Sequence, residues 1–134
     1  MAKKMKRLIA IGFRPVGQWT AENGGIHPSL TDLSDAVNIL YAFVSEGEVL
    51  YVGKTVRTLR ARIYGYQNPG PTQSTNIKVN RLIAEMLQSG RTVRILALPD
   101  NGLLHFGAFH LNLAAGLEDS IVETLQPKWN DAGK

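Results

Sequence analysis

Two β-rich runs separated by a short polar turn constrain the fold of this chain more than any other feature. Residues 39–44 are Ile-Leu-Tyr-Ala-Phe-Val and residues 49–52 are Val-Leu-Tyr-Val, with Ser-Glu-Gly-Glu between them. β-Branched and aromatic residues favour strands, and a glycine in a short connection favours a hairpin. The sequence therefore predicts an antiparallel hairpin over residues 39–52.

The position of Gly47 sets the expected register of this hairpin. A three-residue loop over 45–47, with Gly47 in the left-handed conformation, would place Tyr41 opposite Tyr51. A two-residue loop would instead put the two phenols on opposite faces, because side chains alternate along a strand. We expect the three-residue loop, with both tyrosines on one face.

The remaining elements follow from apolar spacing and turn formers. Strands are expected at 6–13 and 93–98, and helices at 55–65, 77–88 and 111–125. Thr55 is the expected cap of the first helix, and either Thr75 or Asn76 caps the second. Residues 14–29 are expected to be irregular, and 103–109 are ambiguous. The pattern predicts a small α/β protein of the α+β class, with a three-stranded antiparallel sheet flanked by helices.

Length and composition limit the class of protein. The chain has 134 residues and no cysteine, so one domain without disulfides or thiolate metal ligands is expected. Residues 1–37 are expected to form a partly irregular N-terminal extension packed on a core domain of residues 38–131. No apolar run approaches the roughly 20 residues that span a bilayer. The start is basic, but its apolar run is too short for a signal peptide, so a cytoplasmic protein without membrane contact is expected.

Charge is distributed unevenly along the chain. Residues 1–14 carry five Lys or Arg and no acid, whereas residues 15–50 carry five acids and no Lys or Arg. Residues 51–94 carry eight Lys or Arg and one acid. A block this basic is typical of a surface that binds a polyanion, above all nucleic acid. A solvated helix face explains the same charges equally well.

Two charged side chains fall on the apolar faces of expected helices. Arg62 lies on the same helical stripe as Tyr66, and Glu118 lies on or beside the apolar stripe of the last helix. Burying a guanidinium costs several kcal/mol unless it is paired, so its position indicates a partner or a function. The neighbouring charges of Arg60 and Glu123 can face water.

The polar residues resemble the motifs of the GIY-YIG nuclease family. The first motif is present in variant form as Ile39-Leu40-Tyr41, and the second as Tyr51-Val52-Gly53 followed by Lys54. The segment 59–63 resembles the family's basic helix, and 117–120 and 126–130 resemble its closing glutamate helix and Pro-x-aromatic-Asn. The resemblance covers roughly residues 38–131. The glycine of the first motif is replaced by Asn38 or is displaced by one position, and Arg60 is the alternative to Arg62 as the family's arginine.

The resemblance implies a metal-dependent endonuclease that hydrolyses phosphodiester bonds of DNA by a one-metal mechanism. The implied catalytic residues are Tyr41, Tyr51, Lys54, Arg62, Glu118 and Asn130. Glu118 would be the ligand of Mg²⁺ or Mn²⁺, and Tyr41 would be the general base. A phenol ionises near pH 10, so nearby cations must stabilise its charged form. Tyr66 either presents a second phenol to the phosphate or packs against Ile63.

DNA is the expected partner. The expected DNA contacts are Arg57, Arg60, Asn68, Lys78 and Arg81. The alternative function is a DNA-binding module of the same fold whose cleavage is weak or lost. Since one site nicks one strand, double-strand cutting is expected to require a homodimer or two successive binding events.

Overall fold

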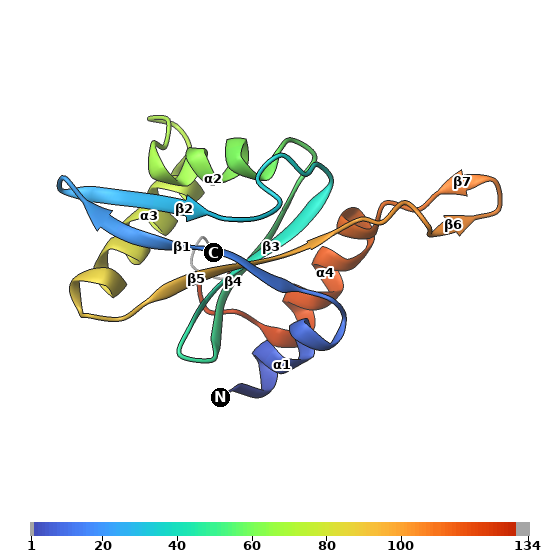
Figure 1. Cartoon of the computed structure of the whole chain (residues 1–134), viewed down its shortest axis with the longest axis horizontal. Coiled ribbons are helices and arrows are strands. Elements are labelled where there is room, and N and C mark those ends of the chain that lie inside the picture. The colour runs from blue at the N-terminus through green and yellow to red at the C-terminus, as the bar shows by residue number, and fades with distance from the viewer. Residues whose placement is uncertain (1, 131–134) are drawn as a thin grey trace.

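A five-stranded antiparallel sheet organises the chain (Figure 1). The computed structural model describes residues 2–130, so residue 131, at which the expected core domain ends, lies outside the described part. The strands are β1 (Arg14–Glu22), β2 (Gly25–Leu30), β3 (Ile39–Ser45), β4 (Glu48–Thr55) and β5 (Val93–Pro99), in the spatial order β2-β1-β5-β3-β4. The α+β class is confirmed, but the expected three-stranded sheet is wrong because β1 and β2 extend it.

Helices cover both faces of this sheet, and a small hairpin stands apart from it (Figure 1). The helices are α1 (Ala2–Ala10), α2 (Leu59–Gln67), α3 (Ser74–Gln88) and α4 (Leu113–Leu125). The separate hairpin pairs β6 (His105–Phe106) with β7 (Phe109–His110). Among residues 2–130, none of the helices has the length and apolar character needed to cross a membrane.

Two hydrophobic cores lie on opposite faces of the sheet. β3 is buried along its whole length between β4 and β5. Because side chains alternate along a strand, Tyr41 and Phe43 enter the core under α2 and α3, whereas Leu40 and Ala42 enter the core under α1 and α4. Consequently, neighbouring residues of β3 pack into different cores on opposite faces of the sheet.

The N-terminal segment differs from its expected structure. Residues 6–13, expected as a strand, mostly belong to helix α1 and the turn that follows it. Leu8 packs with its neighbour Phe13 in the core beneath α4. Residues 14–29, expected as irregular, form the β1–β2 hairpin, whose turn residues Asn23 and Gly24 both have positive φ. Asn-Gly is a strong signal for such a turn, so this hairpin was present in the sequence pattern.

The β3–β4 hairpin has a different register from the expected one. Its loop is the two-residue Glu46-Gly47, both with positive φ, and Tyr41 lies opposite Gly53 rather than Tyr51. A bulge at Leu50 adds one residue to β4, which turns Tyr51 back to the face of Tyr41. The expected loop and pairing are therefore wrong, but the shared face of the two tyrosines is confirmed.

Helix starts also shift by a few residues. The cap of α2 is Thr58, whose hydroxyl accepts a hydrogen bond from the amide of Ala61 at 3.2 Å, and not Thr55. α3 begins at Ser74 after Gln73, so neither Thr75 nor Asn76 caps it. The strand expected at 93–98 is confirmed as β5. These shifts bring Asn76 into the first turn of α3, where its side chain faces the site described below.

Candidate active site

Tyr41, Tyr51, Arg62 and Tyr66 form one group, named here the phenol cluster. The hydroxyl oxygens of Tyr41 and Tyr66 lie 2.7 Å apart, and Nη2 of Arg62 donates a hydrogen bond of 2.7 Å to the Tyr66 hydroxyl. The guanidinium carbon of Arg62 is 4.2 Å from the centroid of the Tyr66 ring. The ring centroid of Tyr51 lies 6.4 Å from that of Tyr41 and 6.0 Å from that of Tyr66. The structure thus joins four of the sequence-predicted residues.

Asn76 and Gln73 hold Arg62 in place, and sequence reasoning missed both of them. Nη2 of Arg62 also donates to Oδ1 of Asn76 at 3.2 Å, and Nδ2 of Asn76 donates to Oε1 of Gln73 at 3.2 Å. The same Gln73 oxygen accepts from the amide of Gly70 at 2.8 Å. Asn76 is buried, which is uncommon for asparagine. From the sequence it is interpreted only as a possible cap of the expected helix. The loop before α3 is thereby connected to the phenol cluster.

Burial dominates the electrostatics of the phenol cluster. It raises the pKa of Tyr41 strongly, although the nearby Arg62 charge lowers that pKa. Burial also raises the pKa of Tyr66 well above the ordinary value for a phenol. For Arg62, burial lowers the pKa, but the neighbouring phenols outweigh it and raise the pKa, so the guanidinium stays charged. Both buried phenols are therefore protonated at neutral pH.

A second polar group lies on the opposite face of the sheet. Nζ of Lys54, on β4, is 3.8 Å from Oε1 of Glu118, on α4. The Glu118 side chain is 23% exposed, which leaves room for water beside its carboxylate. Residues 2–130 hold no group of three or more His, Cys, Asp or Glu suited to a metal. Because Mg²⁺ keeps several waters and needs only one or two carboxylates, Glu118 fits such an ion as its single protein ligand.

The two groups flank Gly53 of edge strand β4 from opposite faces of the sheet. The Tyr41 hydroxyl lies against Gly53 on one face, and Lys54, the next residue, points to the other face toward Glu118. β4 has a neighbour in the sheet on one side only. A ligand at this edge would therefore have the phenol cluster on one side and the Lys54–Glu118 pair on the other.

Asn130 completes the outer edge of β4. Its Oδ1 accepts from the amide of Val52 at 2.9 Å, and its Nδ2 donates to the carbonyl of Val52 at 2.8 Å. The amide of Trp129 donates to the carbonyl of Leu50 at 2.9 Å. The Asn130 side chain therefore fixes the backbone of β4 at Val52, and the Trp129 amide fixes it at Leu50, on the other side of Tyr51.

A cavity of about 450 Å³ opens beside Tyr51 and Asn130. Its remaining lining includes Lys78 and the first residues of α3, Ser74 and Thr75. Tyr51 is therefore the phenol of the cluster that borders a cavity, whereas Tyr41 is 1% exposed. The cavity places one positive charge, Lys78, next to that phenol.

The expected DNA-contact residues are spread over α2, α3 and the segments beside α2. Arg57 is exposed, and Asn68 ends α2. Arg60 forms an exposed ion pair of 2.6 Å with Asp35, and Arg81 forms one of 3.5 Å with Glu85. Arg62, and not Arg60, is the arginine that reaches the phenol cluster.

Comparison with solved structures shows what this arrangement is similar to. A mutant of bacteriophage T4 EndoII matches with a TM-score of 0.69 and 23% sequence identity, over 94% of this chain and 97% of that one. Restriction endonuclease HPY188I in complex with product DNA matches with a TM-score of 0.54 and 16% identity, over 95% of this chain and 81% of that one. No family model and no curated protein matches the chain. At these identities the likeness shows a shared fold, which is that of EndoII and of a restriction endonuclease.

Proposed function

We propose that this protein is a metal-dependent DNA endonuclease of the GIY-YIG type. The observation that carries the proposal is that the phenol cluster and the Lys54–Glu118 pair lie on the two sides of Gly53 in an edge strand. A phosphodiester at this edge would have a guanidinium, an ammonium and a carboxylate around it. The shared fold with a restriction endonuclease solved with product DNA supports DNA as the substrate.

Each residue has a role in the proposed hydrolysis. Water attacks phosphorus and gives its proton to the base, the phosphorus–oxygen bond breaks, and the leaving oxygen takes a proton. Glu118 would hold Mg²⁺ or Mn²⁺, which when bound neutralises charge on the phosphoryl oxygens. The guanidinium donates to Tyr66 and Asn76 through Nη2, and the donors on Nη1 and Nε would reach a non-bridging oxygen. Lys54 adds a second positive charge on the other side of Gly53.

The base is the demanding part of the proposal. The family resemblance assigns Tyr41, whose pKa is raised by burial and lowered by Arg62. Substrate and metal must lower that pKa until the phenol loses its own proton to solvent, because only the phenolate can take a proton from the attacking water. Arg62 is already within hydrogen-bonding distance of Tyr66, which bonds Tyr41, so positive charge lies close to the phenolate that would form.

The burial of Tyr41 favours a second candidate function. A phenol that is 1% exposed and strongly disfavoured as an anion is a poor base in the resting protein. The alternative is a DNA-binding module of the same fold that cleaves weakly or not at all. Its affinity would come from the basic residues 51–94.

A substrate panel separates the two functions. The protein is incubated with supercoiled, nicked and single-stranded DNA and with RNA, each with Mg²⁺, with Mn²⁺ or with a chelator. The nuclease proposal requires cleavage of DNA that the chelator abolishes. Binding of DNA without cleavage in either metal would establish the binding module instead, and preferential cleavage of RNA would overturn DNA as the substrate.

A further inference from the structure

The β6–β7 hairpin projects from the body of the protein (Figure 1). It carries large apolar side chains. It connects β5 to α4. Phe106 is 84% exposed and Phe109 is 79% exposed. Leu104 and Leu111 are also exposed. The largest apolar patch on a soluble protein, usually a few hundred Å², is often functional, so the hairpin is a candidate interaction surface.

Four large apolar residues of the hairpin share one face. Residues 104–111 are Leu-His-Phe-Gly-Ala-Phe-His-Leu. Phe106 pairs with Phe109, His105 pairs with His110, and paired residues lie on the same side of a two-stranded ladder. Alternation therefore puts Leu104, Phe106, Phe109 and Leu111 on one face, named here the arm face, and the two histidines on the other. Such alternation is typical of a sheet that is buried on one side.

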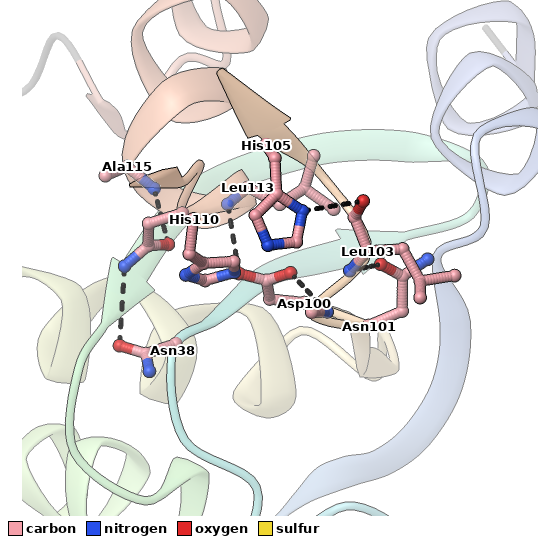
Figure 2. Close-up of polar contacts among 10 residues, drawn as sticks. Asn38, Asp100, Asn101, Leu103, His105, His110, Leu113 and Ala115 are labelled. Atoms are coloured by element: carbon pink, nitrogen blue, oxygen red, sulfur yellow. Dashed lines mark hydrogen bonds and ion pairs between the residues drawn. The ribbon is translucent and has the colours of Figure 1, made fainter. Parts of the chain in front are cut away.

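Polar contacts hold the histidine face and the root of the hairpin (Figure 2). Nε2 of His110 lies 3.0 Å from Oδ2 of Asp100. Asp100 also accepts hydrogen bonds from the amide of Gly102 at 2.9 Å and from the amide of Leu113, the first residue of α4, at 3.2 Å. The hairpin is thus anchored to the helix that carries Glu118, with the arm face presented outward.

The charges of the residues in and around the hairpin favour a protein over DNA as the occupant of the arm face. No Lys or Arg occurs from residue 95 to residue 127. Proteins that insert apolar wedges into DNA hold the adjacent phosphates with cations. Residues 104–111 carry none, and Lys54 and Arg57, which line a cavity beside Asn112, lie at the root of the hairpin and belong to other segments than the arm face. The face therefore suits a protein partner better than a polyanion.

The sequence of the hairpin suits a second copy of this chain. Its order Leu-His-Phe followed by Phe-His-Leu is nearly the same in both directions. A twofold interface must be self-complementary, because the same patch meets itself. Two flat apolar faces with aromatic centres meet that requirement.

The area available agrees with a small dimer interface. Two largely exposed phenylalanines supply about 300 Å² per copy, since an aromatic side chain buries about 150–250 Å². Leu104 and Leu111 enlarge the patch, and two copies double it. The total approaches the ~1,000 Å² expected of a specific interface.

We propose that the arm face packs against the arm face of a second copy and forms a twofold dimer. The dimer does not depend on the proposed nuclease activity. If that activity is present, the dimer supplies a second site for the second DNA strand, with each Glu118 helix linked to the interface through Asp100.

Sedimentation of the DNA-free protein over a dilution series tests the proposal. The wild type is expected to change from dimer to monomer on dilution. Phe106→Ser combined with Phe109→Ser is expected to raise the dimer Kd by at least about 100-fold, because two buried aromatic rings are lost. Ile77→Ser, which removes an exposed apolar residue of α3, is the matched control and should dimerise as the wild type does. Circular dichroism confirms that each variant is folded.

Three outcomes would overturn the arm-face dimer. In the first, the wild type is a monomer at every concentration. In the second, the double variant dimerises as well as the wild type. In the third, the protein is monomeric and the double variant loses affinity for DNA, which would assign the arm face to DNA. A wild-type protein that dimerises but does not cleave DNA would count against the nuclease proposal alone.

Discussion

The hydroxyl of Tyr41 packs directly on the backbone of Gly53. A Cβ at position 53 would lie 2.6 Å from the hydroxyl oxygen of Tyr41 and 2.7 Å from the adjacent ring carbon. Tyr41 cannot withdraw, because its ring is enclosed by Phe43, Tyr51 and Tyr66. Glycine at this position is therefore what allows the phenol to reach the edge strand beside Lys54.

Gly53→Ala is expected to destabilise the protein by about 1–3 kcal/mol, the usual cost of overpacking a core. Gly116→Ala, in α4, is the matched control, because an added Cβ there meets no atom within 4 Å. Helix propensity should make that control more stable by about 0.5–1 kcal/mol. Urea unfolding measures both changes. Equal stability of Gly53→Ala and the wild type would contradict the packing described here.

Arg62→Lys is expected to lower cleavage at least about tenfold, since the charge remains but the planar fork is lost. A lysine that kept the bonds to Tyr66 and Asn76 would have one donor left for the phosphate, whereas the guanidinium of Arg62 has three. Arg14→Lys, which alters an exposed ion pair of β1, is the control and should cleave as the wild type does, and Arg60→Lys should lose less activity than Arg62→Lys. Single-turnover cleavage rates are compared. A larger loss of rate in Arg60→Lys than in Arg62→Lys would show that Arg60, and not Arg62, is the arginine of the site.

Asn76→Ala is expected to reduce kcat through Arg62, which loses its acceptor and becomes more mobile. Asn76→Asp keeps an oxygen for Arg62 and should retain more activity than the alanine variant. KM is expected to change less than kcat, because Asn76 orients a group and does not itself supply charge to DNA. If both variants are as active as the wild type, Asn76 does not position Arg62.

The two buried phenols should make stability fall at alkaline pH. Burial raises the folded-state pKa of Tyr41 and Tyr66 above the ~10 of a free phenol. Below about pH 10 both states keep these protons and no slope results; above it the unfolded chain loses protons that the folded chain retains, so the unfolding free energy falls. The expected slope is about −1.4 kcal/mol per pH unit for each phenol.

Urea unfolding at a series of alkaline pH values measures that slope. The double variant Tyr41→Phe, Tyr66→Phe should have a shallower slope than the wild type. Tyr64→Phe, which alters the exposed tyrosine of the same helix, should keep the wild-type slope. Identical slopes in all three proteins would show that Tyr41 and Tyr66 titrate normally.

Local sequence signals predicted the elements whose conformation depends mainly on their own residues. The β-rich runs gave β3 and β4, and apolar spacing gave α3, α4 and β5, because these patterns reflect burial directly. The register of the β3–β4 hairpin was wrong because the bulge at Leu50 depends on packing beneath α2 and α3, which no local pattern reveals. The β1–β2 hairpin was missed although Asn23-Gly24 signals its turn, since the surrounding Pro and Gly residues obscured the strands.

The sequence singled out several residues that the structure brings together, but it did not reveal how they are arranged. Helical spacing singled out Arg62 and Tyr66, which the structure joins by a hydrogen bond. It did not show that Glu118 pairs with Lys54 on the opposite face of the sheet, because that depends on which face α4 covers. Asn76 escaped notice because a helix-start asparagine has a local explanation, and its contact with Arg62 spans 14 residues.

Cleavage by Glu118→Ala, set against Glu123→Ala, tests the central claim most directly. Both substitutions remove one carboxylate from α4, but Glu118 faces Lys54 and Glu123 is exposed. With supercoiled DNA and Mg²⁺, Glu118→Ala should abolish conversion to nicked circles, while Glu123→Ala should keep the wild-type rate and both should remain folded. If Glu118→Ala nicks DNA at the wild-type rate, this would contradict a metal site at Glu118, and with it the proposed mechanism.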